Sequence, residues 1–215
     1  MTQPQALLID MDGTLVDTEP YWEAAKIRLA TKHGVPFTAE DAAPLVGRSM
    51  MVTVEALKAA GVPLSDEDLL AALVDEVAAR VGEGIPWIDG APEFLQRMAD
   101  AGIPCALVTQ AWEPVAKQIV KASNGVLREL VSGGDVSHPK PHPEPYLLAS
   151  ELLGVDPTRC VAMEDSPAGV ASAEAAGAQV IVLPGMHPVE DSPNRHPVES
   201  LQEIDTALLV RVLNE

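Results

Sequence analysis

Two aspartates follow directly after the first apolar run of the chain, Ala6–Ile9. Asp10 and Asp12 are spaced i, i+2, so an extended backbone carries both side chains to the same side. Gly13 and Thr14 come next and indicate a turn. Two carboxylates at such a turn can share a hard cation, and one can act as a nucleophile while the other transfers a proton. Taken alone, Asp12-Gly13 is more typical of an ordinary turn.

Polar residues with possible chemistry also follow three later apolar runs. Each has an ordinary interpretation as well: a helix cap, a solvated loop lysine, or a helix start with Ser166 as cap and Pro167 in the first turn. If the runs are parallel strands, however, their carboxyl ends meet at one edge of the sheet, where ligands of open α/β sheets bind. In chain order, the residues are Thr109 after Cys105–Val108, Lys140 in the loop after Leu130–Ser132, and Glu164 and Asp165 after Cys160–Met163.

The elements that must position these residues fall into two blocks. From residue 86 onward, apolar runs alternate with helical patterns, which predicts a doubly wound parallel sheet whose fifth strand is Val180–Leu183. Residues 18–85 are predicted to be four helical segments without a strand. We therefore expect an α/β core domain of residues 1–17 and 86–215, into which a helical domain of residues 18–85 is inserted. The Pro-rich stretch Gly185–Glu199 is expected to be an irregular loop, and Ile204–Leu213 a helix that packs on the sheet.

Composition narrows the class of protein. The chain has 215 residues, of which 47% are hydrophobic, and a formal net charge of -18. Such a charge repels nucleic acid and anionic membrane surfaces. No apolar run approaches the roughly 18 residues of a membrane span, and Met1–Gln5 does not resemble a signal peptide, so we expect a cytoplasmic protein. Cys105 and Cys160 each begin an apolar run, which favours buried core residues over a disulfide or a reactive thiol.

The string Asp10–Glu19, which reads DMDGTLVDTE, is far more specific than its first turn. It resembles the haloacid dehalogenase-like (HAD) superfamily of phosphohydrolases, and within it the β-phosphoglucomutase-like branch with a helical cap. The spacing of Thr109, Lys140 and Asp165 matches the later motifs of the same family, so the resemblance covers nearly the whole chain. It implies a Rossmann-like α/β core with an inserted α-helical cap domain.

The resemblance also implies a role for each matching residue. The implied cofactor is Mg²⁺, and the implied cap is a lid that closes over the site, excludes water and selects the leaving group. The implied roles are Asp10 as the nucleophile that becomes an aspartyl-phosphate; Asp12 as the general acid/base; Thr109, with the following backbone amide, as the phosphoryl-holding group; Lys140 as the neutralising cation; Asp165 as a Mg²⁺ ligand beside Asp10 and the backbone carbonyl of Asp12; and Glu164 as support for the metal, directly or through water.

Several positions bear on substrate choice. Gly47 and Arg48 align with the cap loop that meets substrate in this branch, although Arg48 could also be an ordinary surface arginine. Trp22 stands where the mutases carry a histidine, which favours a hydrolase over a mutase; it could line a cap pocket or belong to the cap's core. Gln110 follows Thr109 where Asn or Ser is commoner, and its amide could still bind phosphate.

The loop around Lys140 departs from the family pattern in one place. Pro139 precedes the lysine where glycine is common, which stiffens the loop. His138 and His142 flank it, and we expect both to be solvated loop residues.

The sequence thus predicts a monomeric, Mg²⁺-dependent phosphatase of small phosphomonoesters such as a sugar phosphate or a similar metabolite. One alternative is a phosphoglucomutase-like isomerase, which returns the phosphoryl group to a second hydroxyl; measuring phosphate release against isomer formation separates the two. The other alternative is a non-catalytic regulatory protein on the same fold, because fold alone does not fix function.

Overall fold

The chain forms two compact units in the computed structural model, which describes residues 2–46 and 50–215. The first, which we call the core unit, combines Met1–Asp17 with Pro86–Glu215, and the second, the helical unit, is Thr18–Ile85. The chain leaves and re-enters the core unit at neighbouring points, because the Asp17 amide donates to the Pro86 carbonyl at 2.9 Å.

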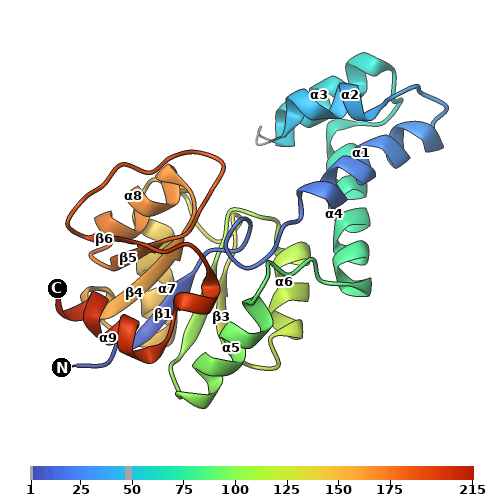
Figure 1. Cartoon of the computed structure of the whole chain (residues 1–215). Coiled ribbons are helices and arrows are strands. Elements are labelled where there is room, and N and C mark those ends of the chain that lie inside the picture. Colours follow the sequence, from blue (N-terminus) through green and yellow to red (C-terminus); the bar gives the residue numbers. More distant parts are fainter. Residues whose placement is uncertain (1, 47–49) are drawn as a thin grey trace. The chain divides into compact units, whose positions relative to one another are not determined.

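The core unit is built on a parallel sheet with the strand order β3-β2-β1-β4-β5-β6 (Figure 1). The four residues of β1 are buried, as expected of a central strand covered on both faces. The strand order reverses at β1, so the open end of the sheet beside β1 is the expected place for a ligand. The strands are β1 Ala6–Ile9, β2 Cys105–Val108, β3 Leu127–Val131, β4 Cys160–Glu164, β5 Gln179–Val182 and β6 Arg195–Pro197.

Helices cover both faces of this sheet. A buried cluster that includes Leu8, Ala162 and Tyr146 joins the sheet to α7 and α8 on one face. The other helices of the core unit, α5, α6 and α9, lie on the opposite face (Figure 1). The bounds are α5 Ala91–Asp100, α6 Glu113–Ala122, α7 Glu144–Leu153, α8 Pro167–Ala175 and α9 Thr206–Asn214, with short 3₁₀ turns at Pro157–Arg159 and Leu201–Glu203.

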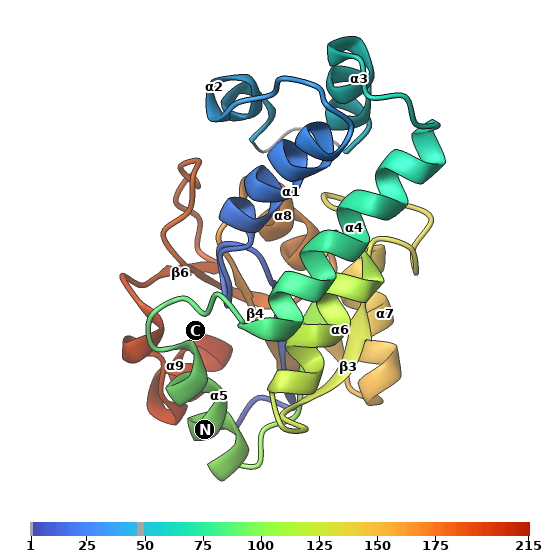
Figure 2. The ribbon, with the colours of Figure 1, turned by 90° about the vertical axis from the view of Figure 1, so that its right-hand side faces the viewer.

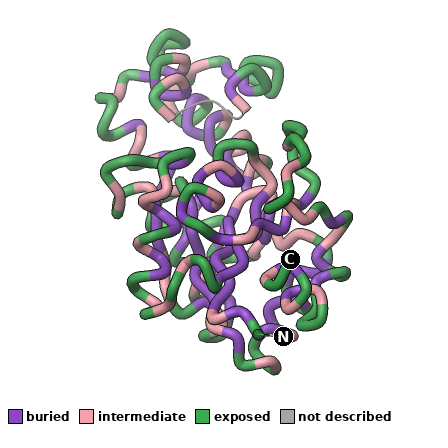
Figure 3. The backbone as a smooth tube through the Cα atoms, turned by 90° about the vertical axis from the view of Figure 1, so that its left-hand side faces the viewer, coloured by how far each residue is buried: buried purple, intermediate pink, exposed green. Residues whose placement is uncertain are grey.

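The helical unit has its own buried side chains (Figure 3). Its two long helices, α1 and α4, contact each other, and Figure 2 shows them side by side. Ser65 caps α4 by accepting a hydrogen bond from the Asp68 amide at 3.1 Å. The unit comprises α1 Glu19–Lys32, α2 Ala39–Ala42, a 3₁₀ turn at Ala43–Leu45, α3 Met50–Ala60 and α4 Asp66–Glu83. Across residues 2–46 and 50–215, no helix combines the length and the apolar character needed to span a bilayer.

Two sequence predictions about the sheet were wrong in detail. The stretch Gly185–Glu199 is not wholly irregular, because β6 lies within it and pairs with β5 in the register Val180↔Arg195. Its sequence, Arg-His-Pro, carries no apolar signal, so only the pairing makes it a strand. Strand β3 starts at Leu127, three residues before the predicted Leu130–Ser132, because polar Arg128 and Glu129 are tolerated in a strand at the edge of the sheet.

Candidate active site

The Lys140 ammonium lies at the carboxyl end of the central strands and joins three of them. It donates to Asp10 Oδ1 at 2.6 Å, to Glu164 Oε1 at 2.6 Å and to the Val108 carbonyl at 2.9 Å. Asp10 directly follows β1, and Glu164 and Val108 end β4 and β2. The three partners occupy all three donors of the ammonium group. Burial acts to lower the pKa of Lys140, but Asp10 and Glu164 outweigh it and raise that pKa above its usual value. The lysine is therefore a fixed positive charge in the site.

The pairing of β1 with β4 extends one residue beyond β1, because the Asp10 amide donates to the Met163 carbonyl at 3.0 Å. This backbone contact fixes Asp10 where its side chain reaches Lys140. The side chain is buried. Burial raises the pKa of Asp10 well above its ordinary value, the Lys140 charge opposes that shift, and nearby Glu164 adds to it. The ionised form that a nucleophile needs therefore depends on positive charge close by.

Glu164 is wholly buried and accepts three side-chain hydrogen bonds. Besides Lys140, it accepts from the Tyr146 hydroxyl at 2.6 Å and from Ser166 Oγ at 3.1 Å. Tyr146 comes from α7 and is itself fully buried, and burial together with Glu164 raises the pKa of its phenol, which keeps it a hydrogen-bond donor. Tyr146 is not among the site residues that the sequence predicts. Its position six residues after Lys140, at the start of a predicted helix, is the only signal that could have suggested it.

Two glycines make room for the acidic side chains. A Cβ at Gly169, in the first turns of α8, would overlap with the Glu164 carboxylate. A Cβ at Gly13 would overlap with the Asp165 carboxylate, and its φ of 85° is in the left-handed region that favours glycine. The Asp12-Gly13 turn thus has a steric function at this site.

Asp10, Glu164 and Asp165 form a group in which one oxygen of each lies within 4.8 Å of the others. Three carboxylates against the one ammonium of Lys140 leave two uncompensated formal negative charges. Burial and the neighbouring Glu164 raise the pKa of Asp165 to about 6, which reports the same excess of negative charge. An oxygen-only group of this charge suits a hard divalent cation rather than zinc.

Asp12 lies near this group without belonging to it, as far as the described residues show. Its side chain is half-buried, and its charge contributes to raising the pKa of Asp165. The metal contact predicted for Asp12 is through its backbone carbonyl rather than through its carboxylate.

Thr109 lies at the end of β2 and is buried. Its Oγ1 accepts from the Ala111 amide at 3.0 Å, which leaves the hydroxyl hydrogen to be donated. The alternative interpretation, a cap of the next helix, does not hold because the cap position of α6 is Trp112. The exposed Gln110 donates from Nε2 to the Lys140 carbonyl at 3.3 Å, so in this structure it supports the lysine loop.

The remaining predicted positions fall into three groups. Gly47 and Arg48 lie outside the described residues. Trp22 is buried in the helical unit and donates from its indole N–H to Thr18 Oγ1 at 3.2 Å, as a core residue would. Cys105 and Cys160 are buried free thiols in β2 and β4, which confirms the core interpretation.

Comparisons with known proteins identify the family of the chain. The family model of the haloacid dehalogenase-like hydrolases matches residues 4–177. Hexitol phosphatase A of Escherichia coli is 36% identical over 83% of this chain and 82% of its own length. Phosphoglycolate phosphatase of Xylella fastidiosa is 30% identical over 93% of this chain and 89% of its own length. The crystal structure of CbbY from Rhodobacter sphaeroides in complex with phosphate superposes with a TM-score of 0.77, at 27% identity, over 93% of this chain and 96% of CbbY. The resemblance seen in the sequence is thereby confirmed, and the chain belongs to the haloacid dehalogenase-like hydrolases.

Proposed function

We propose that this protein is a Mg²⁺-dependent phosphatase that hydrolyses small phosphomonoesters through an aspartyl-phosphate on Asp10. The observation that carries the proposal is the Lys140 ammonium, which holds Asp10 and Glu164 at 2.6 Å each at the open end of the sheet. A buried carboxylate beside a fixed cation is suited to attack an anionic phosphate, because the cation offsets the repulsion between the two.

In the first step, an oxygen of the Asp10 carboxylate bonds to phosphorus while the bond from phosphorus to the ester oxygen breaks. Lys140 is bonded to Oδ1, which leaves Oδ2 as the attacking atom. The buried Thr109 hydroxyl is placed to donate to a phosphoryl oxygen. These contacts bind and orient the phosphoryl group and contribute through positioning and charge, as is general for phosphoryl transfer.

Asp10, Glu164 and Asp165 are the side chains that would hold the magnesium ion. When bound, Mg²⁺ supplies positive charge that stabilises the equatorial phosphoryl oxygens. The protein's own part is to keep these carboxylates ionised and aligned. Lys140, Tyr146 and Ser166 do so for Glu164 through the hydrogen bonds described above.

Asp12 is the proposed general acid/base. It gives its proton to the leaving alkoxide in the first step. In the second step a water attacks phosphorus, the bond to the Asp10 oxygen breaks, and Asp12 takes up the proton of that water. Proton transfer of this kind contributes roughly 10²–10⁴-fold to the rate. Among the described residues, Asp12 lies outside the group formed by Asp10, Glu164 and Asp165, which supports a separate role for it.

The substrate class follows from the relatives. Two of them are named for hexitol and phosphoglycolate phosphatase activity, and CbbY was solved with phosphate. We infer a phosphorylated sugar, sugar alcohol or similar small metabolite.

The helical unit would act as the cap that excludes water and selects the leaving group, with Gly47 and Arg48 as candidate contacts. We further propose a monomer that acts in the cytoplasm; two free thiols are in keeping with that compartment.

A screen of phosphorylated metabolites in the presence of Mg²⁺ tests this proposal. Phosphate release and isomer formation are measured for each compound. The proposal predicts phosphate release from several small phosphomonoesters and its loss on chelation of Mg²⁺. Isomer formation without phosphate release would identify a mutase instead, and no turnover of any compound would favour the non-catalytic alternative.

A further inference from the structure

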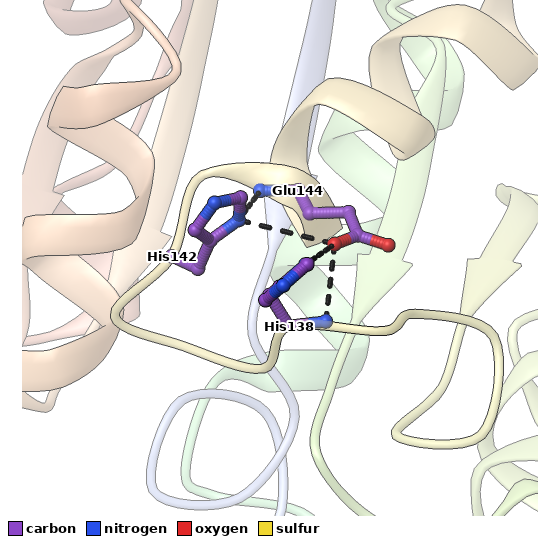
Figure 4. Close-up of side chains that lie close together, drawn as sticks. All are labelled: His138, His142 and Glu144. Carbon is purple, nitrogen blue, oxygen red and sulfur yellow. Dashed lines mark hydrogen bonds and ion pairs between the residues drawn. The ribbon is translucent and has the colours of Figure 1, made fainter.

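A second group of possible metal ligands lies on the loop that carries Lys140. One ligand atom each of His138, His142 and Glu144 lies within 4.8 Å of the others. Figure 4 shows both imidazole rings turned toward the same carboxylate, at the start of α7. This group shares no residue with the Asp10 group, and its two nitrogen donors give it a different metal preference.

We propose that His138, His142 and Glu144 bind a borderline transition-metal ion, with Zn²⁺ as the representative. Imidazole nitrogen with one carboxylate suits zinc, copper or nickel far better than Mg²⁺. The inference goes beyond the proposed phosphatase activity and does not depend on it.

The spacing of the donors is close to that of a metal site. Glu144 Oε2 lies 2.7 Å from His138 Nδ1 and 3.9 Å from His142 Nδ1. A tetrahedral zinc site with bonds of about 2.0–2.1 Å separates neighbouring ligand atoms by about 3.3 Å. Each of the two distances therefore differs from the required one by about 0.6 Å, in opposite directions. Small side-chain rotations toward a common centre are enough to reach it, because all three side chains are at least partly exposed.

The protonation of two of the three donors, His142 and Glu144, also fits. The Glu144 amide donates to His142 Nδ1 at 3.2 Å, which means that this nitrogen carries a lone pair. The Ser137 amide, the His138 ring and the His138 amide all bond to the Glu144 carboxylate and lower its pKa, so it is an anion at neutral pH. These contacts already organise the loop without a metal. An ion would replace the two contacts to the ring nitrogens by metal–ligand bonds.

The loop backbone is held in place before any ion binds. Pro139, Pro141 and Pro143 alternate with the two histidines and Lys140, and each proline fixes its φ angle. Buried Ser172 donates to the His142 carbonyl at 2.5 Å. A preorganised loop loses little conformational entropy on binding, which favours affinity. An ion bound to both flanks of Lys140 would further restrain the segment that carries this lysine.

Titration with Zn²⁺ against a chromophoric chelator, in excess Mg²⁺ to occupy the carboxylate group, tests the proposal. The variants are His138→Asn, His142→Asn and the double variant, with His187→Asn as an exposed histidine control elsewhere in the core unit. We expect one zinc site in the wild type and in the control. Each single variant should bind zinc at least about tenfold more weakly, and the double variant should lose the site.

Equal zinc affinity in the double variant and the wild type would overturn the proposal, as would zinc binding that disappears only with Asp165→Asn. Imidazole signals in NMR spectra of the wild type provide a second readout that needs no variant. Zinc should shift the signals of two of the five histidines, His138 and His142. A shift of His33, His187 or His196 alone would contradict the assignment.

Discussion

At the scale of single residues, the site consists of a buried ammonium group and the carboxylates that surround it. Lys140 holds Asp10 and Glu164, and Tyr146 and Ser166 complete the hydrogen bonds of Glu164. Buried charges are tolerated only when they are paired and hydrogen-bonded, so each of these partners supports the others. The excess negative charge that remains suits a divalent cation, and the positive charge of that cation would offset the repulsion between the carboxylates and an incoming phosphate.

Replacing Tyr146 by Phe removes one hydrogen bond to Glu164 and little volume. A hydrogen bond to a charged group contributes about 1.5–3 kcal/mol, so the free energy of unfolding should fall by that amount. Because Glu164 also positions Lys140, turnover of an aryl phosphate should fall roughly tenfold, and the Mg²⁺ concentration that gives half-maximal activity should rise.

The chain provides a matched control in its other tyrosine. Tyr21 donates to the Gly84 carbonyl at 3.0 Å in the helical unit, at an exposed position. Tyr21→Phe should leave the Mg²⁺ requirement unchanged. If both variants shift that requirement equally, Tyr146 has no special part in the site.

The raised pKa of Asp165 has a consequence for stability. In the folded protein the Asp165 carboxyl stays protonated up to about pH 6, whereas in the unfolded chain it loses its proton near its ordinary pKa of 3.8. Between these values the folded state binds more protons, so without Mg²⁺ the contribution of Asp165 to stability is lost as the pH rises from about 4 to about 6.

Urea unfolding of the wild type and Asp165→Asn in Mg²⁺-free buffer measures this effect. The variant should show a weaker decrease of stability across that window and should gain less from added Mg²⁺ at neutral pH. If the free energy of unfolding depends on pH in the same way in both proteins, Asp165 is not the source of this pH dependence.

At the scale of elements, the site exists because parallel strands end together. The apolar runs of β1, β2 and β4 could be recognised in the sequence, and so could the polar residues that follow them. The contact between Tyr146 and Glu164 could not, because it depends on the packing of α7 against the sheet. Strand β6 was missed for a related reason: Arg195–Pro197 has no strand pattern of its own, and its pairing with β5 is tertiary.

Gly169 lets helix α8 pack directly against the Glu164 carboxylate of the site. Alanine is the better helix former by about 1 kcal/mol, yet a Cβ in α8 would overlap with the Glu164 carboxylate. We expect Gly169→Ala to destabilise the protein by about 1–3 kcal/mol and to reduce Mg²⁺-dependent turnover. In Gly84→Ala, where a Cβ meets no atom within 4 Å, both quantities should stay close to wild type. A stabilising Gly169→Ala substitution would show that Glu164 can move at no cost.

At the scale of the whole molecule, the division of the chain explains what the sequence could predict about function. The core unit carries the recognisable motifs, so the reaction class could be inferred. The proposed function assigns substrate choice to the helical unit, and the loop with Gly47 and Arg48, for which we propose substrate contacts, lies outside the described residues. The formal charge of -18 repels an anionic substrate at long range, so recognition must depend on local cations.

The organisation into units predicts the outcome of a deletion. Asp17 and Pro86 are joined by a backbone hydrogen bond, so a short Gly-Ser linker can replace residues 18–85. The remaining core unit should unfold cooperatively and still be stabilised by Mg²⁺, but it should lose discrimination among phosphorylated metabolites. Loss of cooperative unfolding would show that the core unit depends on the helical unit for its stability.

The proposed bond between Asp10 and phosphorus is tested by measuring Mg²⁺-dependent hydrolysis of an aryl phosphate by Asp10→Asn. Asp100→Asn, at an exposed position in the core unit, is the control. We expect turnover by Asp10→Asn to fall on the order of 10⁴-fold or more, with an unchanged circular dichroism spectrum, and the control to turn over like the wild type. Turnover by a folded Asp10→Asn variant within a few-fold of the wild type would contradict the proposed bond.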